Sequence, residues 1–356
     1  MSKALIAMSG GVDSAVAAKR MLDAGYTCAA VTMKLFSPAN GEVLPDNSCC
    51  SAKDVEDAKR VAAELGIPHT VCDFSDKFDS AVIAPFVDDY ENGRTPNPCI
   101  ACNRHLKFDA LFAYAMGAGF DTIVTGHYAR IEQDANTGRY LLKRAVYAEK
   151  DQSYVLYTLS QNQLAHTQFP LGALPKTDVR AEAAASGLIN ADKPDSQDIC
   201  FVQNGKYTDF IRAYTGKAYP AGDFVDMQGN TLGTHRGIIH YTVGQRKGLG
   251  IAAATPLYVA AVNVADNTVV LGQERDLYTT TLTAKHINLI STPTLDAPLR
   301  VQAKVRYRQA AQDATAVQTD ADTLTVTFDT PQRAVTKGQS VVLYDGDTVV
   351  GGGIIV

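Results

Sequence analysis

The stretch from Ser9 to Ser14, SGGVDS, has the residue types of a loop that binds phosphate. Gly10 and Gly11 would let the backbone curl around an anion, because no Cβ stands in the way. The N–H groups of a helix that follows would face the anion, and two serine hydroxyls would add donors. The usual P-loop places a lysine on the β- and γ-phosphates, and this stretch has none, so a γ-phosphate fits less well. Asp13 would either orient Mg²⁺ or simply occupy the first helical turn.

Cys99 and Cys102 form a second candidate for chemistry, because two prolines stiffen the backbone just before them. We predict that Cys102 begins a helix that carries Arg104, His105 and Lys107. A thiol at the N-terminus of a helix and beside cations has a lowered pKa, which makes it a competent nucleophile. A C-x-x-C pair is also half of a zinc site, but no second pair follows in the sequence.

Cys200 lies in the polar stretch DSQDICF, residues 195–201, which makes it a further candidate for reactive chemistry. Cys28 and Cys72 have the apolar neighbours typical of strands, and we expect both to be buried. The chain has seven cysteines in all. In a reducing compartment they would be thiols, metal ligands or catalytic groups rather than a scaffold of disulfides.

Alternating strand and helix patterns would position these residues. Such alternation predicts a parallel sheet with helices on both faces, and ligands then bind at the carboxyl ends of the strands, where SGGVDS lies. The expected strands are Ala4–Met8, Cys28–Leu35, His69–Phe74 and Asp121–Thr125. The expected helices are Ser14–Ala24, Ala52–Leu65 and Leu106–Met116.

The rest of the chain reads differently. Residues 205–275 mix a short helix, Tyr207–Tyr214, with strands and glycine-rich turns. From about Thr281 onward the pattern is strand-like, and turn pairs such as Asp345-Gly346 separate the strands, which predicts a small β-barrel. The expected strands there are Val301–Tyr307, Thr323–Phe328, Val341–Tyr344 and Val349–Val356.

The bulk composition is that of a globular chain. Its 356 residues suggest two or three domains, and 46% hydrophobic and 20% charged residues are ordinary values. No apolar run is long enough to cross a bilayer, and MSKALIAM lacks the layout of a signal peptide, so we expect a cytoplasmic protein. The net charge of −5 argues against a generally basic coat for nucleic acid but leaves room for a local basic surface.

SGGVDS resembles the PP-loop of the ATP pyrophosphatase superfamily, in which the loop holds the pyrophosphate that leaves when ATP adenylates a substrate. Five further blocks occur in order: GRTPNPCIACNRHLKF, TGHYAR, KDQSYVLY, DSQDICF and HYTVGQRKGLG. Together with the loop they resemble the bacterial tRNA-specific 2-thiouridylase family over essentially the whole chain. The thiouridylases join these blocks in one sequence, which makes the combination specific.

The resemblance implies three domains: a Rossmann-like PP-loop catalytic domain at 1–204, a central linker domain at 205–278 that contacts tRNA, and a C-terminal β-barrel at 279–356 that binds tRNA. It implies thiolation of the wobble uridine, position 34, in the tRNAs for Lys, Glu and Gln. ATP with Mg²⁺ would adenylate O2 of the uracil ring. Sulfur would replace that oxygen, supplied by a cysteine desulfurase directly or through a relay protein.

The resemblance also assigns residues. Cys200 would carry a persulfide, and Cys102 would be the nucleophile that frees sulfide or assists direct transfer, so that a Cys102–Cys200 disulfide forms in each cycle. The residues implied to contact ATP are Ala7, Met8, Ser9, Gly10, Gly11, Val12, Asp13, Ser14, Met33 and Gly126. Those implied to contact the target base are Asn97, Pro98 and Cys99. Those implied to contact tRNA are His127, Lys150, Asp151, Gln152, Arg306, Tyr307, Arg308 and Gln339.

Some of these assignments have alternatives. Many members of the family have an acidic residue where this chain has Cys99, and a third thiol beside Cys102 and Cys200 could instead support an iron–sulfur cluster. His127 could be a core histidine that follows a strand. Period-two spacing would send Lys304, Arg306 and Arg308 to one face of a strand, where they would meet phosphates or only solvent. Two rival functions are a PP-loop ligase with another substrate and a tRNA-binding module with a vestigial ATP loop.

Overall fold

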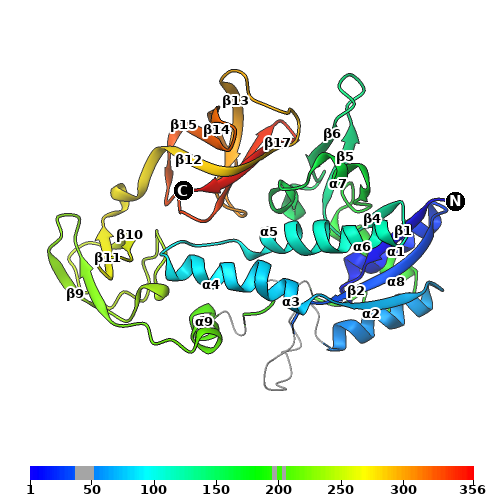
Figure 1. Cartoon of the computed structure of the whole chain (residues 1–356), viewed down its shortest axis with the longest axis horizontal. Coiled ribbons are helices and arrows are strands. Elements are labelled where there is room, and N and C mark those ends of the chain that lie inside the picture. Colours follow the sequence, from blue (N-terminus) through cyan, green and yellow to red (C-terminus); the bar gives the residue numbers. More distant parts are fainter. Residues whose placement is uncertain (37–51, 195–198, 203–205) are drawn as a thin grey trace.

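The computed structural model describes residues 1–36, 52–194, 199–202 and 206–356. Figure 1 shows a parallel sheet with helices at one end of the molecule, a smaller sheet at the other end, and a β-barrel above the helices between them. The expected class is confirmed: a parallel-sheet domain, a small central domain and a C-terminal β-barrel. Among the described residues, no helix is long and apolar enough to span a membrane.

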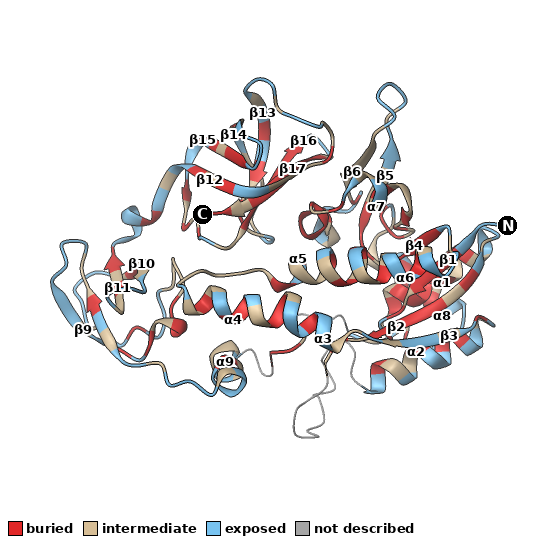
Figure 2. Cartoon of the chain, in the orientation of Figure 1, coloured by how far each residue is buried: buried red, intermediate tan, exposed pale blue. Residues whose placement is uncertain are grey.

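The N-terminal sheet has five strands in the order β3-β2-β1-β4-β7, and all neighbouring strands are parallel. The strands are β1 (Lys3–Ala7), β2 (Thr27–Lys34), β3 (His69–Asp73), β4 (Thr122–Val124) and β7 (Thr167–Gln168). All four predicted strands are present, and Figure 2 shows that the centre of the sheet is buried. The strand order reverses between β1 and β4, and ligands bind at the carboxyl ends of such a pair.

Helices cover this sheet and extend away from it. Helix α1 packs on β1 and β2 and also on α8, where Arg20 and Glu182 form an ion pair of 2.6 Å. Two π-helical turns join short helices into longer rods: Asp79–Ile83 joins α3 to α4, and Asn103–Ala110 joins α5 to α6. The helices are α1 (Val12–Asp23), α2 (Ala52–Glu64), α3 (Ser75–Phe78), α4 (Ala84–Glu91), α5 (Pro98–Cys102), α6 (Leu111–Gly117), α7 (Gln161–Ala165) and α8 (Lys176–Ala185).

The C-terminal barrel closes because β12 pairs with both β15 and β17. Its strands are β12 (Tyr278–Leu289), β13 (Leu299–Lys304), β14 (Gln312–Asp320), β15 (Thr323–Arg333), β16 (Ser340–Asp345) and β17 (Thr348–Ile355). A hairpin of the N-terminal part, β5 (Ala129–Gln133) and β6 (Tyr140–Arg144), joins the barrel where Lys143 pairs with Thr348. The predicted strand Val301–Tyr307 is wrong at its end, because β13 stops at Lys304 and a turn follows.

Among the described residues, the central part has one α-helix, a short 3-10 helix at Ile238–His240 and a four-stranded sheet in the order β10-β11-β8-β9. Its elements are α9 (Tyr207–Thr215), β8 (Gly222–Val225), β9 (Thr231–His235), β10 (Tyr258–Asn263) and β11 (Thr268–Gly272). The predicted helix Tyr207–Tyr214 is confirmed and is one residue longer. In Figure 1 the sheet of this part lies at the end of the molecule farthest from the N-terminal sheet, whereas α9 lies beneath α4.

His240 links α9 to the rest of the central part, and its protonation makes the stability of the protein depend on pH. Arg212 of α9 donates to its Nε2 over 3.0 Å, and burial together with Arg236 and Arg212 lowers the pKa of His240 to about 4. As the pH falls below about 6.5, His240 is therefore protonated in the unfolded chain before it is protonated in the folded protein. We expect the free energy of unfolding to drop by about 2 kcal/mol between pH 6.5 and 4.5 from this group. Denaturant titrations should show a smaller drop in His240→Gln, and an equal drop in both proteins would contradict this assignment.

Candidate active site

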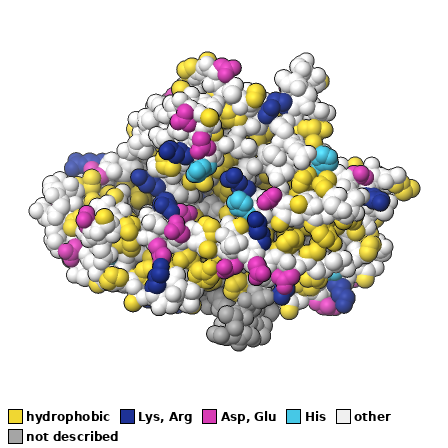
Figure 3. Space-filling view, in the orientation of Figure 1, with side chains coloured by type: hydrophobic (Ala, Val, Ile, Leu, Met, Phe, Trp, Pro, Cys, Tyr) yellow, Lys and Arg dark blue, Asp and Glu magenta, His cyan; other side chains and the backbone are white. Residues whose placement is uncertain are grey.

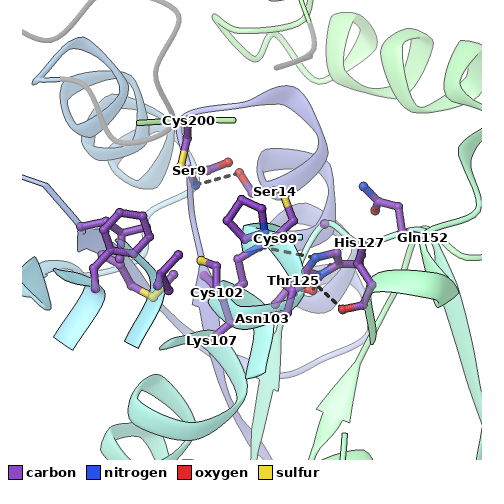
Figure 4. Close-up of a pocket in the computed structure, with 18 of the residues that line it drawn as sticks. Ser9, Ser14, Cys99, Cys102, Asn103, Lys107, Thr125, His127, Gln152 and Cys200 are labelled. Atoms are coloured by element: carbon purple, nitrogen blue, oxygen red, sulfur yellow. Dashed lines mark hydrogen bonds between the residues drawn. The ribbon is translucent and has the colours of Figure 1, made fainter. Parts of the chain in front are cut away.

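A cavity of about 300 Å³ lies at the carboxyl ends of β1, β2 and β4 (Figure 4). Ala7, Met8 and Ser9 line it from the end of β1, Met33 from β2, and Gly126 from the segment after β4. This is the place where the strand order reverses, as expected for ligand binding in an open parallel sheet. Residues that are distant in the sequence therefore meet here. They include the predicted ATP contacts at the ends of the strands, which are Ala7, Met8, Met33 and Gly126.

The loop before α1 is open toward an anion. Helix α1 begins at Val12, two residues before the predicted start at Ser14, and no side chain caps its N-terminus at Gly11. The first N–H groups of the helix can therefore face a phosphate. Ser14 does not add the expected donor, because its hydroxyl donates to the carbonyl of Gly11 over 3.0 Å and accepts from the N–H of Ser9 over 3.3 Å. Ser14 thus shapes the loop rather than supplying a proton to the ligand.

Gly10 holds the loop against the rest of the domain instead of lining the cavity. Its φ of +71° is one that L side chains rarely adopt, and a Cβ there would lie 2.4 Å from the carbonyl oxygen of Asp54. Its own carbonyl accepts hydrogen bonds of 3.1 Å from Asn190 and from Lys193. Gly126 is also fixed by packing, because a Cβ would lie 2.8 Å from the backbone of Asp13 in α1. The expected contact of Gly126 with the nucleotide stays a prediction.

Asp13 is engaged by the protein itself. Its carboxylate accepts hydrogen bonds from Lys176 over 2.6 and 2.8 Å and from the hydroxyl of Tyr128 over 2.6 Å. Among the described residues, no three His, Cys, Asp or Glu side chains lie close enough together to hold a metal ion. The described residues therefore supply no complete ligand set for Mg²⁺ or for an iron–sulfur cluster at Cys99, Cys102 and Cys200.

Three cysteines face the cavity, and all three are thiols in this structure. Cys99 and Cys102 come from α5, whereas Cys200 comes from a segment almost 100 residues later, yet Figure 4 shows all three around the same space as Ser9. The two cysteines predicted to react are therefore brought to one cavity. Of the cysteines expected to be buried, Cys28 is buried, but Cys72 is only half-buried because β3 is the edge strand.

An aromatic cluster fixes the segment that carries Cys200. The ring of Phe201 packs edge-on against Phe78 and Phe86, with ring centroids 5.7 and 5.2 Å apart, and only 4% of Phe201 is exposed. Phe78 also lines the cavity, so the anchor lies close to the thiol. The first half of the predicted motif, residues 195–198, lies outside the described residues.

Cys102 does not begin a helix, so the reason given for a lowered thiol pKa is wrong. Helix α5 begins at Pro98, where Asn97 is the N-cap and its side chain accepts from the N–H of Cys99. Cys102 is the last residue of α5, and the field of a helix N-terminus fades within the first turn. Cys99 has the position in the first turn that we had expected for Cys102. Cations remain nearby, and Lys107 lines the same cavity.

His127 is buried in the cavity and is neutral. Its exposed fraction is 8%, its Nδ1 lies 2.7 Å from the hydroxyl of Thr125, and its Nε2 lies 3.5 Å from Nζ of Lys107. Burial and the charge of Lys107 hold the pKa of His127 well below its usual value. Because an ammonium group can only donate, Nε2 must accept and Nδ1 carries the proton toward Thr125. A tRNA could reach this ring only with a group that enters the cavity.

A groove of about 1120 Å³ adjoins the cavity. Ser9, Asp13, Cys99 and Gln152 line both spaces, so the groove opens directly onto the reactive end of the sheet. The predicted contact residues that line this groove are Asn97, Cys99, Lys150, Asp151, Gln152, Tyr307 and Arg308. On the face shown in Figure 3, basic side chains are interspersed with acidic ones, as the net charge suggests.

Three family models match successive parts of the chain. Residues 2–204 match a family described as a tRNA methyl transferase HUP domain, residues 208–273 a tRNA methyl transferase PRC-barrel domain, and residues 279–355 an aminomethyltransferase β-barrel domain. The chain is 52% identical to a tRNA-specific 2-thiouridylase MnmA of Acetivibrio thermocellus over 354 residues, 99% of each protein. It is 51% identical to the protein of the same name from Clostridioides difficile over 353 residues, 99% of this chain and 98% of that one.

The chain belongs to the tRNA-specific 2-thiouridylase family. The HUP domain of this family implies ATP, and the loop before α1 fits a phosphate group. Among solved structures, the chain is similar to the U34-tRNA thiolase NcsA of Methanococcus maripaludis with its [4Fe-4S] cluster. That similarity has 16% identity and a TM-score of 0.35 and covers 60% of this chain and 64% of the other, so it supports nothing about a cluster here.

Two of the predicted tRNA contacts hold this 2-thiouridylase together. Arg306 lies after the end of β13, and its Nη2 donates to the carbonyls of Val243 and Ala334 and to the hydroxyl of Thr336 over 3.3, 2.8 and 2.7 Å. We had predicted that Arg306 shares a strand face with Lys304 and Arg308, and that prediction is wrong. The Arg306 guanidinium bridges the barrel and the central part.

Gln339 and its neighbours brace the loop that leads to α5. The Gln339 side chain donates to the carbonyls of Thr95 and Pro96 over 2.8 and 3.2 Å, and the N–H of Thr95 donates to the carbonyl of Lys337 over 2.9 Å. A Cβ at Gly338 would lie 3.1 Å from the N atom of Thr95, so the two segments are in close contact. The barrel thus sets the position of the loop that carries Asn97.

Two further basic residues line the groove of this 2-thiouridylase: Lys304, which was already a candidate, and Arg144, which sequence analysis missed. The guanidinium of Arg144 stacks 3.9 Å above the ring of Tyr344, and its buried Nε and Nη2 make no hydrogen bond with the described residues. Lys304 lies 5.8 Å from the ring centroids of Tyr154 and Tyr307. Both line the groove because β6 folds against the barrel. No local sequence pattern predicts this contact between β6 and the barrel.

Proposed function

We propose that this chain thiolates the wobble uridine, position 34, of the tRNAs for Lys, Glu and Gln, in the manner of the relatives named 2-thiouridylases. One observation carries the proposal: Cys102 and Cys200, distant in the sequence, line the same cavity as the loop before α1. A PP-loop ligase for another substrate would need no such pair of thiols. The word methyl transferase in the family descriptions is less decisive, because the relatives of matching length at about half identity are named thiouridylases.

The first step is adenylation of the base. O2 of the uracil ring attacks the α-phosphorus of ATP, the O2–P bond forms, and the bond to the β-phosphate breaks with its electron pair leaving on pyrophosphate. The N–H groups at the start of α1 would stabilise the departing anion. Asn97 of the groove and Pro98 of the cavity would hold the base where the two spaces meet, and the bound base and ATP would displace water from the activated carbon.

The second step transfers sulfur. Cys200 would receive a persulfide from a cysteine desulfurase, directly or through a relay protein. In one route the outer sulfur attacks C2 and AMP leaves, after which the Cys102 thiolate attacks the sulfur of Cys200 and leaves the outer sulfur on the base. In the other route Cys102 first releases sulfide, which then attacks C2. Both routes leave a Cys102–Cys200 disulfide, and a thiol reductant must supply two electrons before the next cycle.

The groove would bind the anticodon loop. Its cations and the ring of Tyr307 suit a single-stranded segment, since phosphates pair with cations and unstacked bases stack on aromatic rings. We propose 1–204 as the catalytic domain, 205–278 as the central tRNA-contact domain and 279–356 as the barrel that binds tRNA. His127, Lys150, Asp151 and Gln152 remain proposed contacts, and tRNA as the substrate favours a cytoplasmic location.

Arg306 and Arg308 should separate tRNA binding from stability. Replacing Arg308 by Met should lower the slope of log K against log salt by about 1, as expected for one lost phosphate contact. Replacing Arg306 by Met should leave that slope unchanged and lower the free energy of unfolding by about 1–3 kcal/mol, because buried carbonyls lose their donor. Filter binding over a salt series and thermal unfolding measure both effects, and exchanged outcomes would reverse the two roles.

Incubation with ATP, a sulfur donor and unmodified tRNA, followed by nucleoside analysis, tests the function. We expect 2-thiouridine in the tRNAs for Lys, Glu and Gln and none in a tRNA without a wobble uridine. A ligase of another substrate would show no tRNA-dependent release of pyrophosphate. A binding module with a vestigial loop would bind tRNA and release no pyrophosphate at all.

A further inference from the structure

Lys107, Lys176 and Lys193 lie near the loop before α1, and among the described residues Lys176 and Lys193 are paired with carboxylates. Lys176 binds Asp13, and Lys193 binds Asp54 and Asp57 over 2.6 and 2.7 Å. The third, Lys107, lines the cavity itself, and no carboxylate of the described residues lies within 4 Å of its ammonium group. The described residues therefore compensate the charges of Lys176 and Lys193 but supply no carboxylate to Lys107.

The π-helical turn at Asn103–Ala110 aims Lys107 into the cavity. Cys102, Asn103 and Lys107 all line this space. In an α-helix, side chains five residues apart point roughly 140° away from each other. A π-helix closes its turn between residues i and i+5, so Cys102 and Lys107 come to nearly the same face. Figure 4 shows both side chains directed toward the cavity.

His127 holds the ammonium group without neutralising it. Its Nε2 lies 3.5 Å from Nζ of Lys107 and can only accept, while its Nδ1 lies against Thr125. The imidazole is neutral, as described above, so the pair retains a full positive charge. A half-buried cation without a counter-charge is costly, and an anionic ligand removes that cost.

We propose that Lys107 is a catalytic residue of the adenylation step and binds a non-bridging oxygen of the α-phosphate. This inference rests on the proposed function. When O2 of uracil attacks the phosphorus, negative charge grows on the α-phosphate oxygens, and an ammonium group already in place stabilises it. In this role Lys107 donates hydrogen bonds to the phosphate and transfers no proton. The loop without a lysine thus receives its cation from another segment, at the phosphate where the bond is made.

Lys107→Met tests this role in the full-length protein. With saturating ATP and tRNA, we expect the single-turnover rate of pyrophosphate release to fall by about 10²- to 10³-fold. Binding of tRNA and persulfide loading of Cys200 should stay within about twofold, because neither involves the α-phosphate. Lys107→Arg should recover part of the rate. Lys77→Met is the matched control. Lys77 is exposed and precedes the cavity residue Phe78 in the sequence, but it does not line the cavity itself, so its loss should leave the rate unchanged.

The possible outcomes are distinct. A rate of pyrophosphate release within about threefold of wild type in Lys107→Met would overturn the proposal, as would equal losses in tRNA binding and persulfide loading. If the Met variant does not fold, Lys107→Gln decides by the same comparison, because it keeps a donor but no charge. A wild-type protein that makes no 2-thiouridine would count against the proposed function instead, whatever the variants do.

Discussion

Replacing Cys200 by Ser should abolish the formation of 2-thiouridine, to below about a thousandth of the wild-type rate. The hydroxyl cannot carry a persulfide, so no sulfur reaches the activated base. Release of pyrophosphate that depends on tRNA should continue, because adenylation uses no thiol. Nucleoside analysis and a pyrophosphate assay on the same samples separate the two steps.

Cys102→Ser should lose 2-thiouridine to a similar extent but for another reason. Cys200 can still load, so protein-bound persulfide should accumulate after addition of the sulfur donor. Cys72→Ser is the matched control, because this half-buried cysteine on β3 lines neither the cavity nor the groove. Full thiolation by either active-site variant would refute the assignment of that cysteine.

Gly10→Ala should cost both activity and stability. A methyl group would lie 2.4 Å from the carbonyl oxygen of Asp54, at a φ of +71° that alanine rarely adopts. The loop must move away from Asn190 and Lys193, and we expect pyrophosphate release to fall by about 10²-fold. The free energy of unfolding should fall by about 3 kcal/mol from strain and overpacking together.

Gly66→Ala separates these two causes. Gly66 has nearly the same φ, +68°, but nothing lies within 4 Å of the position of its Cβ. It should lose only about 1 kcal/mol, the ordinary cost of a left-handed residue, and keep its activity. Equal losses in the two variants would mean that backbone conformation, rather than contact with Asp54, explains the sensitivity of Gly10. Thermal unfolding and the pyrophosphate assay measure both quantities.

Local sequence patterns predicted the strands and the loop whose conformation depends mainly on neighbouring residues. Apolar runs between turn residues located four strands of the parallel sheet, and the loop at the end of β1 located the cavity. The start of α5 was mistaken, although its signal was present. Asn97 followed by Pro98 is a cap followed by a first helical residue, and this pair places the helix start at Pro98 rather than at Cys102.

Other features depend on contacts between distant segments, and the local sequence does not predict them. The π-helical turn that directs Lys107 into the cavity follows no pattern of residue types that we could read. Arg306 resembled a phosphate contact because cations alternate around it, but the strand ends at Lys304 and its side chain bonds to Val243 and Ala334 instead. Arg144 acquires its place only when β6 meets the barrel.

The brace between the barrel and the loop before α5 couples the position of the barrel to the position of the candidate active site. Three hydrogen bonds, from Gln339 to Thr95 and Pro96 and from Thr95 to Lys337, join the two segments. A displacement of the barrel would therefore also displace Asn97 and the thiols that follow it. If the barrel binds tRNA, as we propose, a tRNA that is seated wrongly would misplace the reactive groups, so the C-terminal part of the chain would check the substrate before the reaction.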